Sequence, residues 1–272
     1  MLLNNKKIGF IGAGNMAFAI IKGLINSKAV LADQITAADP NTGKLSELNK
    51  TLDIHNFADD NVSIVKDCDI IIFAIKPQQL ETVLDEIKSI DNKNKLFVSI
   101  VAGAKTEFFE TFLSEAKVIR VMPNFPALIS EAMSGVCGGQ YATQEDLKTA
   151  CEIFDAVGKT VTVSEEQLDA ITGVSGSGPA FVFKFIEALS DAGVRAGLSR
   201  DNAILLAAQT VLGSAKMVLE TKAQPMSLKD MVTSPGGTTI EGVYQLDKGG
   251  FSASVMNAVD AAVKRAKELG AK

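Results

Sequence analysis

The chain has 272 residues, of which 47% are hydrophobic, 22% charged and 6% aromatic, and it contains no Trp. This length fits one large domain or two modest ones, with cores large enough to fold without disulfides or a structural metal. Lys and Arg number 27 against 32 Asp and Glu, a net charge of -5, and no basic block is present. This balance argues against a nucleic-acid-binding protein.

The cysteine and histidine content argues against a metal site. Cys68, Cys137 and Cys151 form an odd set without a CxxC pair, and His55 is the only histidine. Zinc fingers, iron–sulfur centres and disulfide frameworks therefore fit poorly, and no metal is expected. Free cysteines are typical of a reducing, cytoplasmic location, which we predict.

The sequence also predicts no targeting or membrane segment. Lys6 and Lys7 lead directly into an apolar run at 8–11, which leaves no room for a signal peptide. No run approaches the roughly 20 apolar residues that span a bilayer. We therefore expect a soluble protein that does not bind membranes.

The first half of the chain alternates between two hydrophobic periodicities. Short β-rich runs predict strands at 7–11, 34–38, 68–75, 96–101, 117–122, 132–137 and 160–163. Helical patterns lie between them, at 16–26, 79–90 and around 145–156. Continuous apolar strands alternating with helices indicate a parallel sheet covered on both faces, a doubly wound Rossmann-type α/β domain over residues 1–164.

The second half is predicted to be entirely helical and to form a separate domain over residues 165–272. Helices are expected at 167–173, 179–196, 200–221, 240–246 and 252–269. The segment 200–221 is apolar on more than one side, because Ile204 and Val211 belong to one stripe and Leu205 and Leu212 to another. A surface helix needs only one stripe. The second stripe fits burial against another subunit or within a monomeric bundle.

A glycine-rich turn follows the first predicted strand and opens a helix. Gly12 permits the tight turn, Gly14 lets the backbone approach a pyrophosphate, and Ala17 lets helix and strand pack closely. The N–H groups and dipole of the following helix then favour phosphate. A lone GxGxxA is a weak signal, but the strand before it and the helix after it favour dinucleotide binding.

Three further positions lie where strands end, at the edge where open α/β sheets bind ligands. Asp39 ends the second strand. A carboxylate there accepts ribose hydroxyls and repels a 2′-phosphate, which mildly favours NADH over NADPH. The alternative is that Asp39 only satisfies backbone groups of a turn. Lys44 is near enough in sequence to neutralise a phosphate. Lys76 faces the cleft or is a solvated strand-end lysine, and Asn124 orients a nicotinamide or stiffens a turn.

Two segments rich in Ser, Thr and Gly precede predicted helices in the second half. One spans residues 175–179 before a helix near Ala180, and the other spans 234–239. Each presents N–H groups and hydroxyls at a helix start, where anions bind or where an ordinary cap suffices. Two such segments in one helical domain favour a substrate that carries a carboxylate.

The chain resembles the pyrroline-5-carboxylate reductase family nearly end to end. The motifs that carry the resemblance are IGFIGAGNMA at 8–17, AIKP at 74–77, MPNFP at 122–126, TGVSGSGPA at 172–180 and LKDMVTSPGGTT at 228–239. The last is the most specific, and the first is shared with many dehydrogenases. The resemblance implies reduction of 1-pyrroline-5-carboxylate to L-proline with NADH or NADPH, the last step of proline biosynthesis.

The resemblance also implies homodimers, which interlock through the helical domain and can assemble into rings, and it implies roles for individual residues. The substrate is expected at Ser234, Gly236, Gly237, Thr238 and Thr239, with Thr239 near the ring nitrogen and, with Lys76, a candidate catalytic residue. The cofactor is expected at Gly12, Gly14, Asn15, Met16, Asp39, Asn61, Ala74, Lys76, Pro77 and Asn124. Asn61 would contact the adenosine ribose.

Asp39 and Phe125 depart from the family pattern. Relatives that prefer NADPH generally carry a small, hydroxylic or basic residue in place of Asp39, so the cofactor stays open between NADH and NADPH. Phe125 stands where a threonine is common, beside the nicotinamide. Two other functions are alternatives. One is that of a β-hydroxyacid dehydrogenase, although the sequence around Lys184 does not match that around the catalytic lysine of such enzymes. The other is that of a nucleotide-binding regulator without catalysis.

Overall fold

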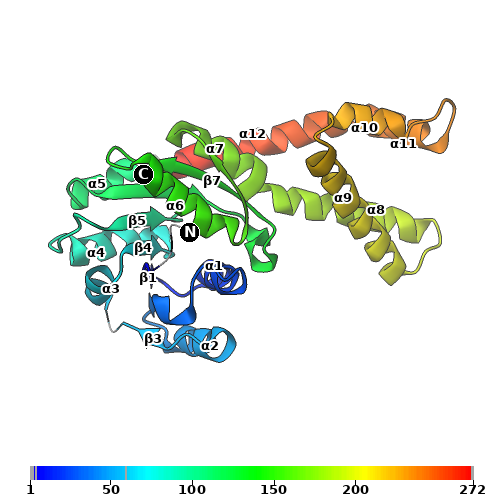
Figure 1. Ribbon diagram of the computed structural model, residues 1–272. Coiled ribbons are helices and arrows are strands. Elements are labelled where there is room, and N and C mark those ends of the chain that lie inside the picture. Colours follow the sequence, from blue (N-terminus) through cyan, green and yellow to red (C-terminus); the bar gives the residue numbers. More distant parts are fainter. Residues whose placement is uncertain (1–2, 4, 59, 271–272) are drawn as a thin grey trace. The chain divides into compact units, whose positions relative to one another are not determined.

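The computed structural model describes residues 3, 5–58 and 60–270, which divide into two compact units. Unit 1 comprises the described residues up to Ser177 together with those from Ala262 onward, and unit 2 comprises Gly178–Ala261. The boundary that the sequence predicts after residue 164 stays a prediction. The two units are drawn in Figure 1, where unit 2 is coloured from yellow-green to orange.

Unit 1 is built on one sheet, in which the described residues form eight strands in the order β3-β2-β1-β4-β5-β6-β7-β8. The strands are β1 (Ile8–Ile11), β2 (Ile35–Ala38), β3 (Asn56–Phe57), β4 (Ile70–Phe73), β5 (Leu96–Ser99), β6 (Lys117–Met122), β7 (Ala132–Gly138) and β8 (Gly158–Thr162). All neighbouring strands are parallel except β6 and β7. From β1 the chain adds β2 and β3 on one side of β1 and then β4 on the other side. The carboxyl ends of β1, β2 and β4 therefore meet at one edge, as in a doubly wound sheet.

Helices cover both faces of this sheet. They are α1 (Asn15–Asn26), α2 (Thr42–Leu52), α3 (Asn61–Asp67), α4 (Pro77–Ile87), α5 (Thr106–Phe112), α6 (Gln144–Asp155) and α7 (Leu168–Ile171). In β4, Ile70 and Ile72 belong to the core that contains α1 and α6, whereas Ile71 and Phe73 belong to the core that contains α3, α4 and α5. Burial on both faces explains why this strand is apolar without alternation.

The sequence prediction differs from the structure at β7. We predicted an extension of a parallel sheet, but β7 runs antiparallel to β6, with Met122 opposite Gly135. A parallel neighbour needs a long crossover. The segment 123–131 between the two strands contains only the short 3-10 helix η2 (Phe125–Ile129), so the chain can only turn back.

Sequence patterning also missed α2, α3, α5 and the two-residue strand β3. Two of these helices have recognisable caps, because Asn41 accepts from Gly43 N–H and Asp60 accepts from Ser63 N–H. Short, polar helices bury few residues (Leu48 alone in α2), so their apolar periodicity is weak.

Unit 2 consists of α8 (Gly178–Arg195), α9 (Arg200–Thr221), α10 (Pro225–Met231), α11 (Thr238–Lys248) and the first part of α12 (Phe251–Gly270). No strand lies among its residues, all of which the structure describes. The sequence missed α10, although Pro225 at its first position is a start signal. The fold class that the sequence predicts, a Rossmann-type sheet followed by an all-helical region, is confirmed.

Helix α9 is mostly exposed in the single chain. By length and composition it could cross a membrane, since its most apolar window has a mean hydropathy of 1.4, and only 11% of that window is buried. Leu205, Leu212 and Leu219 are 67%, 59% and 63% exposed. Exposed apolar surfaces of this kind are typical of interaction sites.

Candidate functional site

The glycine-rich turn joins β1 to α1 at the edge where the strands of unit 1 end. Gly12 has φ +98° and donates its N–H to Ala38 O over 2.8 Å. A Cβ on Gly12 would lie 2.5 Å from Ala74 O at the end of β4. Only glycine therefore allows the turn to lie this close to the neighbouring strand end.

The turn leaves room for a ligand at Gly14. A Cβ there would have no described atom within 4 Å, so the backbone faces open space. Gly14 is the N-cap of α1 and has no side chain with which to cap it, and the first N–H groups of a helix lack acceptors within it. The N–H groups of Asn15 and Met16 therefore form an anion site beside a position that only glycine leaves open.

A cavity of about 910 Å³ opens beside this turn. It is lined by residues from the ends of β1, β2 and β4 and from α1, α2, α3 and α4. Eight of the ten predicted cofactor residues line it: Gly12, Gly14, Asn15, Met16, Asp39, Asn61, Ala74 and Lys76. Pro77 and Asn124 are not among its lining residues.

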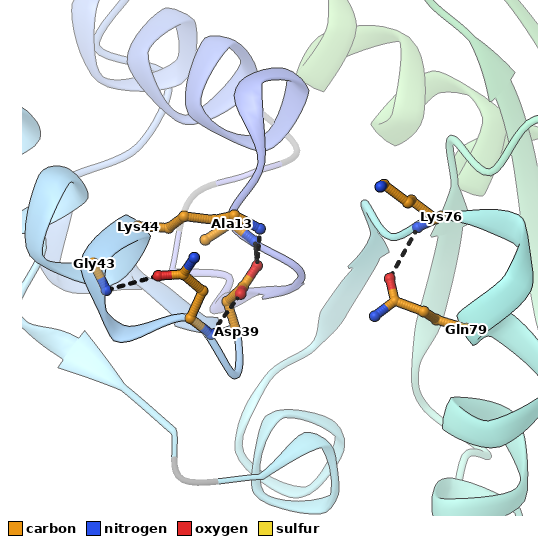
Figure 2. A network of polar contacts seen from close by, with 7 residues as sticks. Ala13, Asp39, Gly43, Lys44, Lys76 and Gln79 are labelled. Atoms are coloured by element: carbon orange, nitrogen blue, oxygen red, sulfur yellow. Dashed lines mark hydrogen bonds and ion pairs between the residues drawn. The ribbon is translucent and has the colours of Figure 1, made fainter.

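Asp39 is bound to the glycine-rich turn itself (Figure 2). Its Oδ2 accepts from Ala13 N–H and from Lys44 Nζ, each over 2.9 Å, and its Oδ1 accepts from Asn41 N–H over 2.8 Å. The Asp39 side chain is 7% exposed. Burial opposes ionisation and raises the pKa of Asp39, but the bonds from Ala13, Lys44 and Asn41 outweigh burial and hold that pKa below its ordinary value.

The start of α3 contributes Asn61 to the same cavity. Asp60 caps this helix by accepting from Ser63 N–H over 2.7 Å. Asn61 lines the cavity, and its Nδ2 donates to Glu86 Oε2 on α4 over 2.7 Å. We did not predict Glu86 from the sequence, because a charged residue in the last turn of an amphipathic helix belongs to no motif.

Lys76 and Pro77 form the start of α4. Lys76 is the N-cap residue and its N–H donates to the Gln79 side-chain oxygen over 3.3 Å, while Pro77 begins the helix (Figure 2). Proline is favoured at this position, since its missing N–H has no acceptor there. The exposed Lys76 side chain lines the cavity together with Gln79.

Asn124 stiffens the turn after β6, the second of the two roles that the sequence predicts for it. It is 8% exposed, its Oδ1 accepts from Met133 N–H over 2.9 Å, and its Nδ2 donates to Ser175 O over 3.1 Å. Both amide groups thus bind backbone, and the carboxamide ties the end of β6 to the start of β7 and to the segment before α8. Phe125, the next residue, is 59% exposed.

The segment 175–179 contains a helix start, as expected, because α8 begins at Gly178, but a helical turn and not an open loop precedes it. The chain enters α8 from α7 through a π-helical turn, η4 (Thr172–Gly176), in which Ser177 N–H donates to Thr172 O over 2.8 Å. Pro179 is the second residue of α8, in the first turn, where a missing N–H leaves no helical bond unmade. The segment is therefore an irregular passage between helices, and one of its N–H groups is already bonded.

The segment 234–239 does precede a helix start, in unit 2. Gly236 has φ +67°, a conformation that favours glycine, and a Cβ on Gly237 would displace the Ser234 hydroxyl. Gly237 N–H donates to Ser234 O over 3.1 Å. Gly237 is the N-cap of α11 and supplies no side-chain cap, so the N–H groups of Thr238 and Thr239 are free of helical acceptors.

The predicted substrate residues thus form one exposed loop in unit 2, whereas the predicted cofactor residues belong to unit 1. Among the described residues, no group of three or more His, Cys, Asp or Glu is placed to hold a metal ion. The chemistry that this arrangement offers is binding of anions and hydroxyls at two helix starts, with Lys76 as the cation beside the first.

Comparison with known proteins assigns both parts of the chain. Residues 165–269 match the model described as pyrroline-5-carboxylate reductase dimerisation, and residues 7–103 match that of the NADP oxidoreductase, coenzyme F420-dependent. The chain is 50% identical to a pyrroline-5-carboxylate reductase of Methanosarcina acetivorans, over 99% of this chain and 100% of that protein. It is 46% identical to one of Arabidopsis thaliana, over 97% of this chain and 95% of that protein.

Solved structures agree with these matches. A pyrroline-5-carboxylate reductase of Coxiella burnetii has a TM-score of 0.93 at 35% identity, covering 98% of this chain and 99% of that one. A pyrroline carboxylate reductase of Plasmodium falciparum, described with NADP bound, has a TM-score of 0.86 at 36% identity, covering 98% of each chain.

Proposed function

The chain belongs to the pyrroline-5-carboxylate reductase family, and from this premise we propose that it reduces 1-pyrroline-5-carboxylate to L-proline with a hydride from NADH or NADPH. The observation that carries the proposal in this chain is the open backbone at Gly14 beside the free N–H groups of Asn15 and Met16. These groups fit a pyrophosphate, because a phosphate oxygen can approach where any other residue would place a Cβ.

The cavity beside Gly14 would hold the rest of the dinucleotide. Asn61 and Asp39 would lie at the adenosine ribose, and Ala74 and Lys76 would lie toward the nicotinamide, which supplies the hydride when it is bound. Lys76 would hold negative charge or order water there. Asn124 would act by fixing the loop after β6, since both its amide groups bind backbone.

The loop 234–239 would bind the substrate in this proposal. The N–H groups of Thr238 and Thr239 at the start of α11 would hold the substrate carboxylate, helped by the helix dipole. The Thr239 hydroxyl would hydrogen-bond near the ring nitrogen. Because a protonated imine is already a good electrophile, the main task of these residues is to hold the ring in one orientation, and correct orientation accounts for most of the rate.

We also propose that a second copy of the chain covers the apolar surface of unit 2. The structure describes every residue of unit 2, and in the single chain only Ser190, Ala203 and Ala207 of this unit are buried. Leucines on two sides of α9 are exposed. The match to the dimerisation model covers this region. Because α9 carries Gln209, Thr210 and Ser214 between its leucines, a packed protein surface suits it better than lipid.

Leu212→Lys is the variant that tests this assembly. Sedimentation should show that the protein is a dimer or a ring of dimers and that Leu212→Lys shifts it toward monomer, whereas Lys50→Glu, at an exposed lysine on α2 in unit 1, should not. An assembly that survives Leu212→Lys would contradict an interface on α9.

With Cys68, Cys137 and Cys151 all free, we propose a reducing location, the cytoplasm.

The reaction is tested by following the absorbance of NADH and of NADPH with 1-pyrroline-5-carboxylate as acceptor. We expect turnover, and we expect 1-pyrroline, which lacks the carboxylate, to be a far poorer substrate. Gly14→Val should abolish cofactor binding without unfolding the protein, because no described atom lies within 4 Å of its Cβ. Turnover of hydroxyacids but not of cyclic imines, or cofactor binding without any turnover, would overturn the proposal.

A further inference from the structure

The adenosine end of the cavity is lined by more acidic than basic groups. Asp39 comes from the end of β2, Asp60 from the start of α3 and Glu86 from α4, while Lys44 of α2 is the cation at this end. Asp60 is occupied by Ser63 N–H and Glu86 by Asn61. These neutral donors leave both carboxylates charged, so an adenosine 2′ substituent meets an excess of negative charge, which Lys44 offsets through its ion pair with Asp39.

The two members of this pair differ in freedom. Asp39 is held by two backbone N–H groups, from Ala13 in the phosphate turn and from Asn41, so its carboxylate cannot move away from an incoming anion without breaking the turn. Lys44 Nζ is held by Asp39 over 2.9 Å, and its side chain is 43% exposed. The carboxylate is thus held by two backbone N–H groups, whereas the ammonium that neutralises it is on a partly exposed side chain with Asp39 as its printed partner (Figure 2).

A fixed carboxylate has opposite consequences for the two cofactors. It accepts the ribose hydroxyls of NADH, but it repels the 2′-phosphate of NADPH. With Lys44 bonded to it, the pair has no net charge, and a 2′-phosphate meets an ammonium as well as a carboxylate. Without Lys44, the same phosphate would meet an unshielded negative charge that the backbone holds in place.

We propose that Lys44 is the residue that admits NADPH to this site, and that it acts by neutralising Asp39 rather than by supplying the phosphate site alone. This inference rests on the proposed dinucleotide-dependent function and specifies its cofactor. It makes Asp39 a brace of the phosphate turn that serves both cofactors. The preference between them, which Asp39 alone would direct to NADH, is then set by Lys44.

The test is a cycle of Lys44→Met, Asp39→Asn and the double variant. Dissociation constants for NADH and NADPH are measured by nicotinamide fluorescence without substrate, and the ratio of the two kcat/KM values is measured with it. Lys44→Met should lower the preference for NADPH over NADH about tenfold, mainly by weakening NADPH. The double variant should restore the ratio to within about threefold of the wild type, because the repelling charge is then absent.

Taking a ratio removes the effect that Asp39→Asn has on the phosphate turn, since the turn binds the pyrophosphate of both cofactors. Lys50→Met, an exposed lysine on the same helix, is the matched control and should leave the ratio unchanged. Lys44→Gln serves if the methionine variant is poorly folded.

Two results would overturn the inference: a ratio that Lys44→Met leaves within about twofold, or a double variant as selective as Lys44→Met alone. The second would mean that Lys44 holds the phosphate directly. Because the dissociation constants are read without substrate, a protein that binds both cofactors as expected but turns over no imine would refute the proposed function and leave this inference standing.

Discussion

The guanidinium of Arg120 donates a hydrogen bond to the carboxylate of Glu165 over 3.1 Å, from a position in β6 that is only 8% exposed. Glu165 also accepts from Thr106 N–H over 2.8 Å and from Thr106 Oγ1 over 2.9 Å. One carboxylate thus joins β6, the start of α5 and the segment that follows β8. Three donors are satisfied together by the two oxygens of this carboxylate, and its removal leaves a buried cation unpaired.

We therefore expect Glu165→Ala to destabilise the fold by roughly 3 kcal/mol, the usual cost of leaving a buried charge without its partner. Glu165→Gln, which keeps an acceptor for Thr106, should cost less than half as much. Urea unfolding measures both, with Glu166→Gln on the exposed neighbouring residue as the control. Equal losses for Glu165→Ala and Glu166→Gln would show that the Arg120 pair contributes nothing.

Asn124 can be tested by a substitution that changes only one of its bonds. Asn124→Asp keeps the acceptor for Met133 N–H but places a carboxylate oxygen against Ser175 O. The expected loss of unfolding free energy is about 2 kcal/mol, since a buried bond is replaced by a repulsion. Asn92→Asp, at an amide that donates to Ser114 O on the surface, should cost far less. An Asn124→Asp protein as stable as the wild type would contradict the structural role.

The charge of Asp39 predicts a pH dependence of stability. Its folded-state pKa lies below its ordinary value of 3.8, because the bonds from Ala13, Lys44 and Asn41 outweigh burial. The stabilisation is therefore fully present above the unfolded value and is lost as the pH falls through the folded-state pKa. The difference in unfolding free energy between wild type and Asp39→Asn should be constant from about pH 7 to about pH 5 and shrink toward pH 3. A difference that grows on acidification would refute this sign.

Thr239→Ala should lower kcat/KM for 1-pyrroline-5-carboxylate about tenfold, the effect of one lost hydrogen bond of roughly 1.4 kcal/mol. Thr239→Ser keeps the hydroxyl and should stay within about threefold of the wild type. Thr221→Ala, which removes an exposed hydroxyl at the end of α9, is the control. If alanine and serine at position 239 behave alike, the hydroxyl takes no part in the reaction.

The three cysteines should differ in reactivity. Burial raises the pKa of the Cys68 thiol, and burial together with the nearby Glu165 raises the pKa of Cys137 to about 12. Because the thiolate is the reactive form, neither should react with iodoacetamide in the folded protein. Cys151 is only half-buried, so mass spectrometry should find it alkylated first. Alkylation of Cys137 before unfolding would show that β7 opens in the native state.

Much of unit 1 could be predicted from local pattern. The apolar strands, the helices between them and the glycine-rich turn are specified by residues close together in sequence, because a strand buried on both faces and a tight turn each demand particular residue types. The direction of β7 could not be predicted this way. The direction of β7 depends on the short length of the segment that connects it to β6. An apolar run has the same pattern in a parallel and in an antiparallel strand.

The sequence by itself therefore determined the fold class, the family and the presence of a tight glycine-rich turn at Gly12 and Gly14. Only the tertiary structure decided what two of the predicted site residues do. Asp39 braces the turn through Ala13 N–H and is neutralised by Lys44, and Asn124 binds two backbone groups far from it in sequence. Sequence reveals that a polar side chain stands at a strand end, but its partners come from other strands and helices, and those partners are set only when the chain packs.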